Sequence, residues 1–348
     1  MKKINLGNRE IGINNPTFII AEIGINHQGD VNIAKELILK AKGSGADAVK
    51  LQKRSLNRIL TKAGLEALYD NRNSFGKTYG EHKKFLELSE DEYHELFLFC
   101  KELNIIFCAS GWDEESIDFL NNLGVPFFKM ASADLTNTPL LLHTAKKNKP
   151  MILSTGMANM KTVEYAYSEV TKINKQVALL QCTSTYPASF SEINLNVLHT
   201  YLSKFPNSVV GYSGHEQGIA IPTAAVAIGA RIIERHFTLD RTMKGGDHAA
   251  SLEPQGFSKM VRDIRHIEEA MGSYDKKMQD SEILVFKKLG KSIVSKSNIT
   301  ANVLITPDML TTKGPGTGIS PMRINEIIGK KSKNDIPADQ IIMEDDIL

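Results

Sequence analysis

The sequence predicts an α/β protein whose main part is a (β/α)8 barrel, a TIM barrel. Eight short apolar runs, rich in β-branched or aromatic residues, alternate with stretches of helical periodicity over residues 17–271. The apolar runs are continuous rather than alternating with polar residues, which is typical of parallel strands covered on both faces. Eight strand-helix units in a segment of this length fit a closed barrel better than an open doubly wound sheet.

The eight expected strands come in chain order, and a helical stretch follows each of them. The strands are expected at residues 17–23, 46–52, 105–109, 126–131, 150–154, 176–182, 208–212 and 231–237. The helices are expected at residues 31–42, 91–103, 113–123, 138–147, 160–172, 195–204, 219–228 and 255–271.

Two segments interrupt this regular alternation. Residues 53–89 form a long polar connection between the second and third strands, and we expect an excursion over the mouth of the barrel. Residues 4–13 are expected to form a hairpin that closes the floor of the barrel.

The composition changes after the last barrel helix. Residues 272–281 are polar and charged, as in a linker, and short β-type segments with glycine and proline turns follow. We therefore expect a barrel domain at residues 1–275, a linker at 276–286 and a small β-rich domain at 287–348. A module of that size gains stability from docking onto a partner.

Composition and charge are those of an ordinary globular protein. Hydrophobic residues make up 42% of the chain, and a net charge of +2 comes from 42 basic and 40 acidic residues mixed along it. This gives no electrostatic basis for a nucleic-acid partner. No apolar run is long enough to span a membrane, and residues 1–10 lack the apolar core of a signal peptide, so we expect a cytoplasmic protein without a membrane partner. The three cysteines lack metal-binding spacing, and we expect them to be reduced and mostly buried.

Polar or ionisable residues follow all eight expected strands. In a barrel of this type the active site lies at the carboxyl ends of the strands, so we expect these residues to share one cavity. They are Glu22, Lys50, Gln52, Ser110, Lys129, Ser132, Asp134, Ser154, Thr183, Ser184, Tyr186, Ser213, His215, His236 and Asp247. Two lysines and several hydroxyls suit a ligand that carries a phosphate and a carboxylate.

His215 and His236 follow the last two expected strands. One helical stretch separates these strands, so they should be parallel neighbours with both imidazoles at the same end of the barrel. Neutral imidazole suits divalent transition metals, and two histidines with few other soft ligands leave coordination positions open, as a catalytic metal requires. A metal there could polarise a carbonyl, with Glu22 and Asp247 available for proton transfer.

Each of these residues also has a structural interpretation that the sequence alone leaves open. A histidine at a strand end can be a packing residue. Glu22 could cap a helix or pair with Lys50, and Lys129 could pair with Asp134. Trp112 could line the pocket, but we expect it to pack within the wall instead. Five further histidines fall in helical or surface stretches and are expected to be solvated, namely His82, His94, His143, His199 and His266.

A series of tracts resembles the sialic acid synthases, the phosphoenolpyruvate-dependent nonulosonic acid synthases. The tracts cover nearly the whole expected barrel in the family's order: IIAEIGINHQGD from Ile19, GADAVKLQ from Gly45, GKTYGEHK from Gly76, FFKMASADLTN from Phe127, ILSTGM from Ile152, LQCTSTYP from Leu180, GYSGHE from Gly211 and ERHFTLDRTMKGGDHAASLEP from Glu234. The segment from Leu289 onward resembles the antifreeze-like (SAF) domain that these synthases carry.

The resemblance implies a transferase that condenses phosphoenolpyruvate with open-chain N-acetylmannosamine, or its 6-phosphate, and releases phosphate by C–O cleavage to form N-acetylneuraminate. It implies catalytic roles for Glu22, His215, His236 and Asp247, with a divalent metal, Mn²⁺ or alternatively Mg²⁺ or Co²⁺, on His215 and His236. It implies sugar contacts for Gln52, Asp134, Tyr186 and Asp247, and phosphoenolpyruvate contacts for Lys50, Ser110, Lys129, Ser132, Ser154, Thr183, Ser184 and Ser213. It also implies a domain-swapped homodimer in which the SAF domain caps the active site of the other subunit.

Two positions depart from the family pattern. Asp134 stands where members often have glutamate, which retracts the carboxylate by one methylene. Gly314, preceded by Lys313, stands where microbial members often place an arginine that faces the acyl-amino group of the sugar. The identity of the sugar therefore stays open, and a legionaminic or other nonulosonic acid synthase acting on a diacetamido hexose is an alternative.

Two functions outside this family are less consistent with the sequence. A metal-dependent amidohydrolase-like barrel would usually carry a His-x-His on its first strand, where this chain has Glu22, Ile23 and Gly24. An ice-binding function of the tail would require a regular threonine ladder, which the tail lacks.

Overall fold

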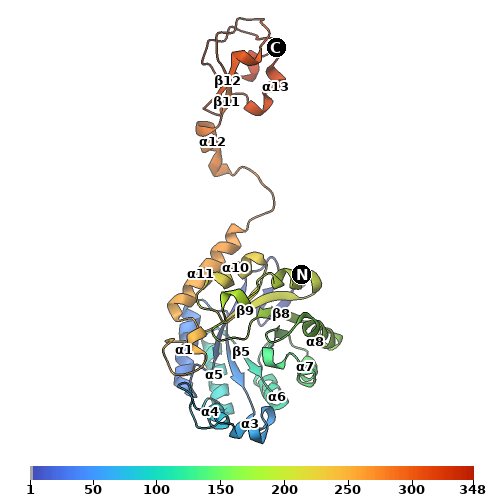
Figure 1. Ribbon diagram of the computed structural model, residues 1–348, viewed down its shortest axis with the longest axis vertical. Coiled ribbons are helices and arrows are strands. Elements are labelled where there is room, and N and C mark those ends of the chain that lie inside the picture. The colour runs from blue at the N-terminus through green and yellow to red at the C-terminus, as the bar shows by residue number, and fades with distance from the viewer. Residues whose placement is uncertain (1–2) are drawn as a thin grey trace. The chain divides into compact units, whose positions relative to one another are not determined.

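The computed structural model describes residues 3–348. The chain divides into two compact units, one that ends at Gly272 and one at Ser273–Leu348 (Figure 1). None of the helices described for residues 3–348 has the length and apolar character of a membrane span.

The first unit contains a closed barrel of eight parallel strands, as the sequence predicts. The strands close in the order β10-β3-β4-β5-β6-β7-β8-β9. Their bounds are β3 (Phe18–Gly24), β4 (Ala48–Lys53), β5 (Ile106–Gly111), β6 (Phe128–Met130), β7 (Met151–Ser154), β8 (Val177–Cys182), β9 (Val209–Gly214) and β10 (Ile232–His236). Each end lies within about two residues of its expected position, because continuous apolar runs mark strands that are buried on both faces.

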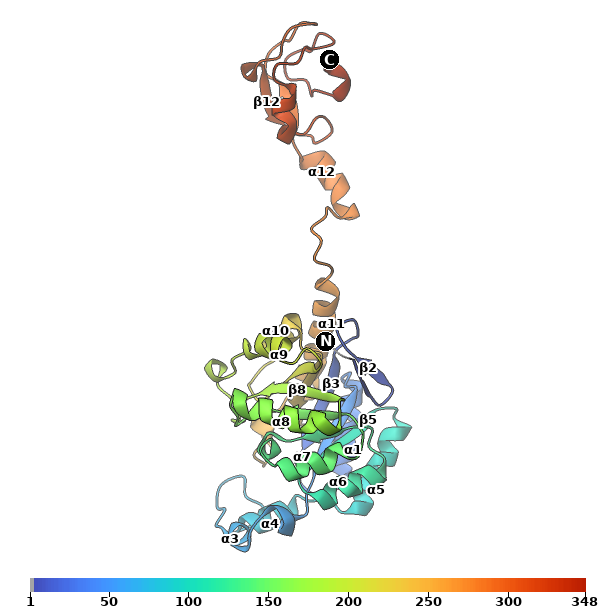
Figure 2. The same ribbon diagram turned by 90° about the vertical axis from the view of Figure 1, so that its right-hand side faces the viewer.

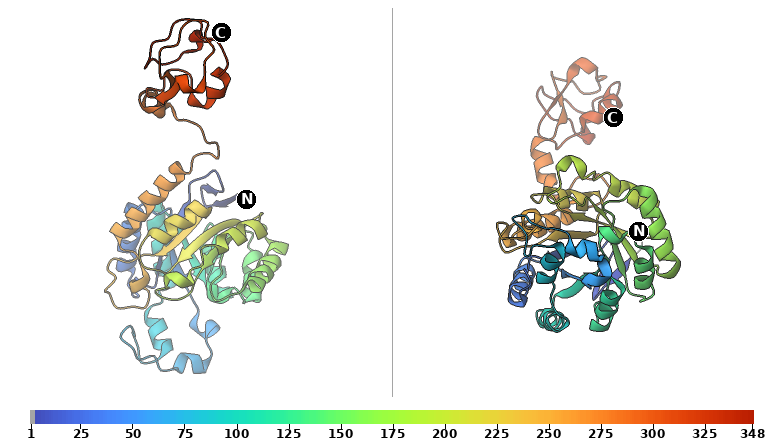
Figure 3. Two further views of the ribbon diagram at one scale, coloured as in Figure 1. Left: turned by 45° about the horizontal axis from the view of Figure 1, so that its top comes forward. Right: turned by 60° about the horizontal axis from the view of Figure 1, so that its bottom comes forward.

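Eight helices surround the barrel, one after each strand (Figure 3). They are α1 (Val31–Gly43), α5 (Glu90–Glu102), α6 (Glu114–Leu123), α7 (Thr138–Ala145), α8 (Met160–Ile173), α9 (Val197–Lys204), α10 (Ala220–Ile228) and α11 (Pro254–Ala270). Side-chain caps fix several of their starts: Asp30 accepts from two backbone N–H groups of α1, and Ser89 forms a capping box with Glu92 of α5. These caps determine where the loops at the barrel mouth end.

Two apolar cores hold the barrel. The larger one lies between the strands and the helices and includes Leu37, Leu96 and Phe257. The smaller one lies among inward-facing strand residues, and Ile4, Leu6 and Ile11 pack against it. These three residues belong to an antiparallel hairpin of β1 (Ile4–Leu6) and β2 (Arg9–Ile11), which confirms the expected hairpin at the floor.

The expected excursion also forms, between β4 and β5. It contains the short helices α2 (Leu56–Ile59), α3 (Lys62–Glu66) and α4 (Tyr79–Phe85). Figure 2 shows this segment at the end of the first unit opposite the β1-β2 hairpin, which is the end where the strands finish. His82 of α4 is buried, so the expectation that it is solvated is wrong: its ring packs against Tyr69 and Phe75 within the excursion.

The second unit is a small β-rich module, as the sequence predicts. Its paired strands are β11 (Ser292–Ser295) and β12 (Leu310–Lys313), and isolated bridges such as Ile299 with Ile336 extend the pairing. The short helices α12 (Ile283–Leu289) and α13 (Ile324–Ile327) flank these strands along the chain. The core is built almost entirely of isoleucine, with Ile293, Ile305 and Ile342 fully or nearly fully buried.

Candidate active site

The strand register brings ionisable side chains together at one end of the barrel. Lys50 of β4 lies opposite Glu22 of β3, and Glu22 lies opposite His236 of β10. Further round the barrel, Ser110 lies opposite Lys129. Because parallel neighbours in a closed barrel end at the same side, these residues form one layer across the mouth.

This layer borders a cavity of about 240 Å³. All eight barrel strands contribute to its wall. The residues that line it are Glu22, Lys50, Gln52, Ser110, Trp112, Lys129, Ala131, Ser132, Ala133, Ser154, Met157, Cys182, Ser184, Tyr186, Ser213, His215, Glu234 and His236.

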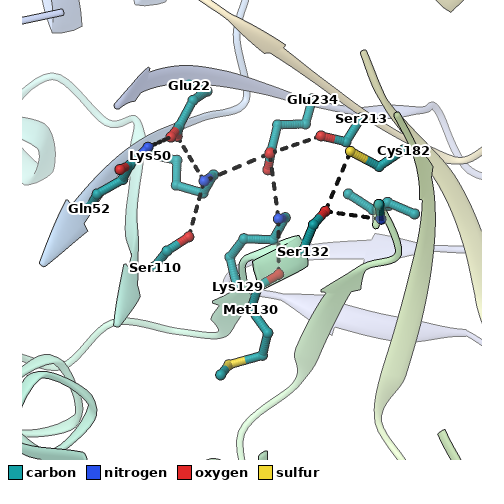
Figure 4. A network of polar contacts seen from close by, with 12 residues as sticks. Glu22, Lys50, Gln52, Ser110, Lys129, Met130, Ser132, Cys182, Ser213 and Glu234 are labelled. Carbon is teal, nitrogen blue, oxygen red and sulfur yellow. Dashed lines mark hydrogen bonds and ion pairs between the residues drawn. The ribbon is translucent and has the colours of Figure 1, made fainter. Parts of the chain in front are cut away.

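Two lysines and two glutamates form a buried network at the base of the cavity (Figure 4). Nζ of Lys50 lies 2.9 Å from Oε2 of Glu22 and 3.7 Å from Oε1 of Glu234. Nζ of Lys129 lies 3.5 Å from the same Glu234 oxygen. Lys50 also donates to Oγ of Ser110 at 3.1 Å. Opposite charges therefore alternate through the layer, which allows four ionisable groups to be buried together.

Burial and pairing shift the pKa values of these groups in different directions. Burial lowers the pKa of both lysines, but Glu22 and Glu234 outweigh it at Lys50, whose pKa is raised, while the pKa of Lys129 stays lowered. Burial raises the pKa of both glutamates. At Glu234 the two lysines outweigh burial and lower the pKa, whereas the pKa of Glu22 remains raised. Glu22 is thus the carboxyl group in this layer that holds a proton more readily than usual.

Several buried polar atoms around the cavity have no hydrogen-bond partner in the part of the chain that the structure describes, residues 3–348. They include Oγ of Ser154, Oε2 of Glu234 and Nδ1 of His236. A buried polar group without a partner is unfavourable, and such groups gathered on one cavity indicate that a polar ligand completes the site. Ser213 already donates to Oε1 of Glu234 at 3.2 Å, and Ser132 accepts from the backbone N–H of Gly156 at 3.0 Å.

His215 and His236 meet at the edge of this cavity, with ring centroids 5.3 Å apart. Nδ1 of His215 lies 2.7 Å from the carbonyl oxygen of Thr183, and its protonation there would leave Nε2 free to bind a ligand. Burial lowers the pKa of His236 to about 3, so its imidazole is neutral, as metal ligation requires. Among residues 3–348, no three His, Cys, Asp or Glu side chains are grouped closely enough to hold a metal ion. Two neighbouring imidazoles at the edge of a cavity can hold a divalent cation only if water or substrate supplies its other ligands.

Tyr186, Gln52 and Asp247 lie next to the histidine pair and Glu22. The ring of Tyr186 lies 4.0 Å from that of His215, and Nε2 of Gln52 donates to Oε1 of Glu22 at 2.8 Å. Oδ2 of Asp247 lies 3.6 Å from Nδ1 of His236. The polar groups of Tyr186, Gln52 and Asp247 are spaced around the histidine pair and Glu22. This arrangement suits a ligand with several hydroxyl groups.

The structure does not bring every expected residue into the cavity. Thr183 follows β8, but its hydroxyl donates to the carbonyl of Glu192 at 3.0 Å and faces a neighbouring hollow. Asp134, at the end of the 3-10 helix η1 (Ser132–Asp134), lines a different hollow beside the cavity. Successive residues of an extended segment point to opposite sides, so Ser184 reaches the cavity and Thr183 does not.

The structure also decides between the alternative roles that the sequence left open for Glu22, Lys129 and Trp112. Glu22 does pair with Lys50. Lys129 does not pair with Asp134 but with Glu234, which the sequence analysis did not single out. Glu234 precedes His236 by two residues on β10, and the two-residue repeat of a strand was the available signal that both face the cavity. Trp112 lines the cavity, which was the alternative to the expected packing within its wall.

Comparison with known proteins places this site in a family. The model of the NeuB family matches residues 37–276, and that of the SAF domain matches residues 290–348. The human N-acetylneuraminate-9-phosphate synthase is 47% identical over 97% of this chain and 94% of its own length. The N,N'-diacetyllegionaminic acid synthase of Campylobacter jejuni is 43% identical over 94% and 99%.

A solved structure shows the same likeness in three dimensions. The N-acetylneuraminic acid synthetase of Leptospira borgpetersenii serovar Hardjo-bovis, determined in complex with citrate, aligns with a TM-score of 0.71 and 36% identity over 81% of this chain and 94% of that one. The family model covers most of the barrel, including every strand end described above except Glu22. On this evidence the chain belongs to the NeuB family, with a SAF domain at its carboxyl end.

Proposed function

We propose that this protein is a phosphoenolpyruvate-dependent nonulosonic acid synthase, a transferase that condenses phosphoenolpyruvate with open-chain N-acetylmannosamine or its 6-phosphate. The observation that carries the proposal is the buried layer of Lys50, Lys129, Glu22 and Glu234 beside the His215 and His236 pair in one cavity. The layer suits an anionic substrate, and the pair suits a metal that a second substrate can reach. The relatives named above as N-acetylneuraminate-9-phosphate and N,N'-diacetyllegionaminic acid synthases supply the reaction class.

Phosphoenolpyruvate would bind over the lysine layer. Lys50 and Lys129 offer ammonium groups, and the hydroxyl of Ser154 has no hydrogen-bond partner among residues 3–348. Ser213, Ser110 and Ser132 surround the same space. The phosphate and carboxylate oxygens would accept hydrogen bonds from these donors.

His215 and His236 would hold a divalent metal, Mn²⁺ or alternatively Mg²⁺ or Co²⁺. When bound, the metal would supply Lewis acidity that makes the aldehyde carbon of the sugar electrophilic and offsets negative charge on its oxygen. Tyr186, Gln52 and Asp247 would hold the sugar hydroxyls beside the pair, since their side chains surround it.

The reaction forms one C–C bond and, at the carbon that carries the phosphate, replaces one C–O bond by another. The methylene carbon of phosphoenolpyruvate bonds to the aldehyde carbon, and the aldehyde oxygen gains a proton and becomes a hydroxyl. Water then forms a C–O bond to the carbon that carries the phosphate and loses its two protons, one of which balances the proton gained by the aldehyde oxygen. Inorganic phosphate leaves with the electrons of its own C–O bond and carries the other proton. Glu22 is placed to hold or deliver the protons, because it is buried, has a raised pKa and is oriented by Gln52 and Lys50.

We also propose a cytoplasmic homodimer in which the SAF domain of one subunit caps the active site of the other. Helix α12 supports association, because Ile283, Leu284, Val285, Phe286 and Leu289 all expose their apolar side chains. Light scattering after gel filtration should give twice the mass of 38.5 kDa. A monomer at catalytic concentrations would contradict this part of the proposal.

A diacetamido hexose is the alternative sugar, because a relative of 43% identity is named as a legionaminic acid synthase. The test of the function is to incubate the protein with phosphoenolpyruvate, Mn²⁺ and N-acetylmannosamine, its 6-phosphate or the diacetamido hexose in parallel, and to measure released phosphate and the nonulosonic acid. We expect product with at least one sugar and loss of product with EDTA. No phosphate release with any of the three sugars would overturn the proposed function.

A further inference from the structure

A buried ion pair lies on the outer side of the strands that carry the two histidines. Arg235 of β10 and Glu216, which follows β9, are both 0% exposed, and Nη1 of Arg235 lies 2.7 Å from Oε1 of Glu216. Successive residues of a strand point to opposite faces, so Arg235 points away from the cavity that Glu234 and His236 line. Neither member of the pair lines the cavity, and neither takes part in the proposed reaction.

The pair ties the loop after β9 to β10. Nη1 of Arg235 also donates to the carbonyl oxygen of Gly218 at 2.9 Å, and its Nη2 donates to the carbonyl oxygen of Glu216. One guanidinium on β10 thus binds three acceptors within residues 216–218. The hydroxyl of Tyr212 of β9 donates to Oε2 of Glu216 at 2.6 Å. The carboxylate of Glu216 is therefore held from two adjacent strands at once.

Gly214 at the end of β9 makes room for this arrangement. A Cβ at Gly214 would lie 2.5 Å from Oε2 of Glu216 and 2.6 Å from a ring carbon of Tyr212. Gly214 is also the residue of β9 that stands opposite Arg235 in the register. The side chain of Glu216 thus folds back against the end of its own strand, in a space that a larger residue at position 214 would fill.

Stability alone does not account for this ion pair. Buried charges lose their hydration, and a well-packed apolar pair of similar volume is often equally stable or more stable. Nε of Arg235 is also buried without a hydrogen-bond partner among residues 3–348, which adds to the cost. The pair supplies a fixed geometry that apolar side chains would not, because a planar guanidinium binds its acceptors in set directions.

The geometry that the pair fixes is that of the two histidines. Glu216 directly follows His215, and Arg235 directly precedes His236. The backbone N–H of Ala188 donates to the carbonyl oxygen of His215 at 3.1 Å, which holds the same loop from β8. Two imidazoles can share one metal ion only while their separation is kept, here 5.3 Å between ring centroids.

We propose that Glu216 and Arg235 are positioning residues that hold His215 and His236 in place to share one divalent metal ion. This rests on the proposed function, which places a metal on the two imidazoles. Loss of the ion pair would free the loop after β9 to move relative to β10, so metal affinity would fall although both imidazoles remain. Substitution of residues that orient metal ligands lowers affinity by about 10- to 100-fold.

The test titrates the full-length protein with Mn²⁺, alone and with phosphoenolpyruvate, and measures free Mn²⁺ by electron paramagnetic resonance. We expect Arg235→Lys to raise Kd for Mn²⁺ by about tenfold or more, because lysine keeps the charge but cannot bind the three acceptors in the same directions. Tyr212→Phe keeps the ion pair and loses one hydrogen bond to the carboxylate, so it should raise Kd by about fivefold.

Leu6→Ala is the control for a loss of stability alone. Leu6 is buried at the floor of the barrel, so this variant should melt at a lower temperature than the native protein and keep the native Kd. All titrations are done well below the melting temperature of each variant.

A Kd for Arg235→Lys within about twofold of the native value would overturn the positioning role and leave the proposed function intact. If Arg235→Lys does not fold, Tyr212→Phe decides by the same criterion. A native protein that binds no Mn²⁺ in either condition would instead overturn the proposed metal centre on which this role rests.

Discussion

Oε2 of Glu22 lies 2.9 Å from Nζ of Lys50, and both side chains are almost completely buried. The two residues stand opposite each other on adjacent strands, so the register of the barrel fixes their distance. Glu234 and Lys129 continue the alternation of charge towards Ser213. The four groups that stabilise one another in the buried layer are therefore also the groups proposed to act on the substrates.

Loss of Glu234 should destabilise the barrel as well as the site. Glu234→Gln leaves Lys129 buried without a carboxylate, and we expect the free energy of unfolding to fall by about 3 kcal/mol, as for other buried pairs that lose one partner. Urea unfolding followed by the fluorescence of Trp112, the single tryptophan, measures this. Glu164→Gln, which removes an exposed pair with Lys204, should cost less than about 1 kcal/mol. Equal losses in both variants would contradict the prediction.

Removal of either histidine of the pair should abolish turnover without unfolding the protein. We expect His215→Ala and His236→Ala to retain their circular dichroism and to lose phosphate release, because one imidazole alone would not retain the proposed metal. EDTA should inhibit the native enzyme, and added Mn²⁺ should restore it. His199→Ala, an exposed histidine outside the site, is the control and should remain active. Retained activity in either variant would remove that residue from the metal site.

His27 should make the protein sensitive to acid. Burial, with Arg54 nearby, lowers its pKa to about 4, whereas an unfolded chain binds the proton near pH 6.5. Because the unfolded state binds the proton first as the pH falls, this depressed pKa costs stability from about pH 6.5 down to about pH 4.

The loss attributable to His27 between pH 7 and pH 5 should be about 2 kcal/mol. Urea unfolding at the two pH values measures it. We expect His27→Gln to lose less stability between them than the native protein, and His199→Gln to lose as much as the native protein. The same loss in all three proteins would show that His27 is not the source.

A methyl group at Gly156 should weaken binding of phosphoenolpyruvate. A Cβ there would clash with Oγ of Ser184 and lie 2.9 Å from Oγ of Ser132, on the hydroxyl side of the cavity. We expect Gly156→Ala to raise KM for phosphoenolpyruvate by about tenfold, as expected for the loss of one hydrogen bond to a charged ligand. Gly43→Ala, where a Cβ would meet nothing, should leave KM unchanged. Steady-state kinetics at saturating sugar distinguishes these outcomes.

The strand ends could be predicted from sequence because continuous apolar runs mark buried parallel strands. This pattern predicts that Lys50, Lys129 and the histidine pair lie at strand ends. Because all strands of a closed parallel barrel end on the same side, it also predicts that these residues share one cavity. Glu234 was not predicted as a site residue. It lies inside an apolar run, and the run marks the strand without showing which face a charged residue in it occupies. Only its partners Lys50 and Lys129, far away in the chain, explain its burial.

The connections were harder to predict than the strands. The buried position of His82 depends on how Tyr69 and Phe75 fold back within the excursion, which no periodicity reports. The outward orientation of Thr183 depends on a carbonyl nine residues away. Side chains on loops are placed by such individual contacts, and a single sequence does not contain a repeating signal for them.

The barrel strands and the excursion between β4 and β5 differ in how far their sequences can change without disturbing the site. The groups proposed to act in the condensation, including Lys50, Lys129 and Glu234, sit on strands whose register is fixed around the closed barrel, so almost any shift there disturbs several of them at once. The excursion is a connection, and connections tolerate changes of length and sequence while the strands that anchor them stay in place. A change confined to this segment therefore leaves the register of the buried charged layer intact.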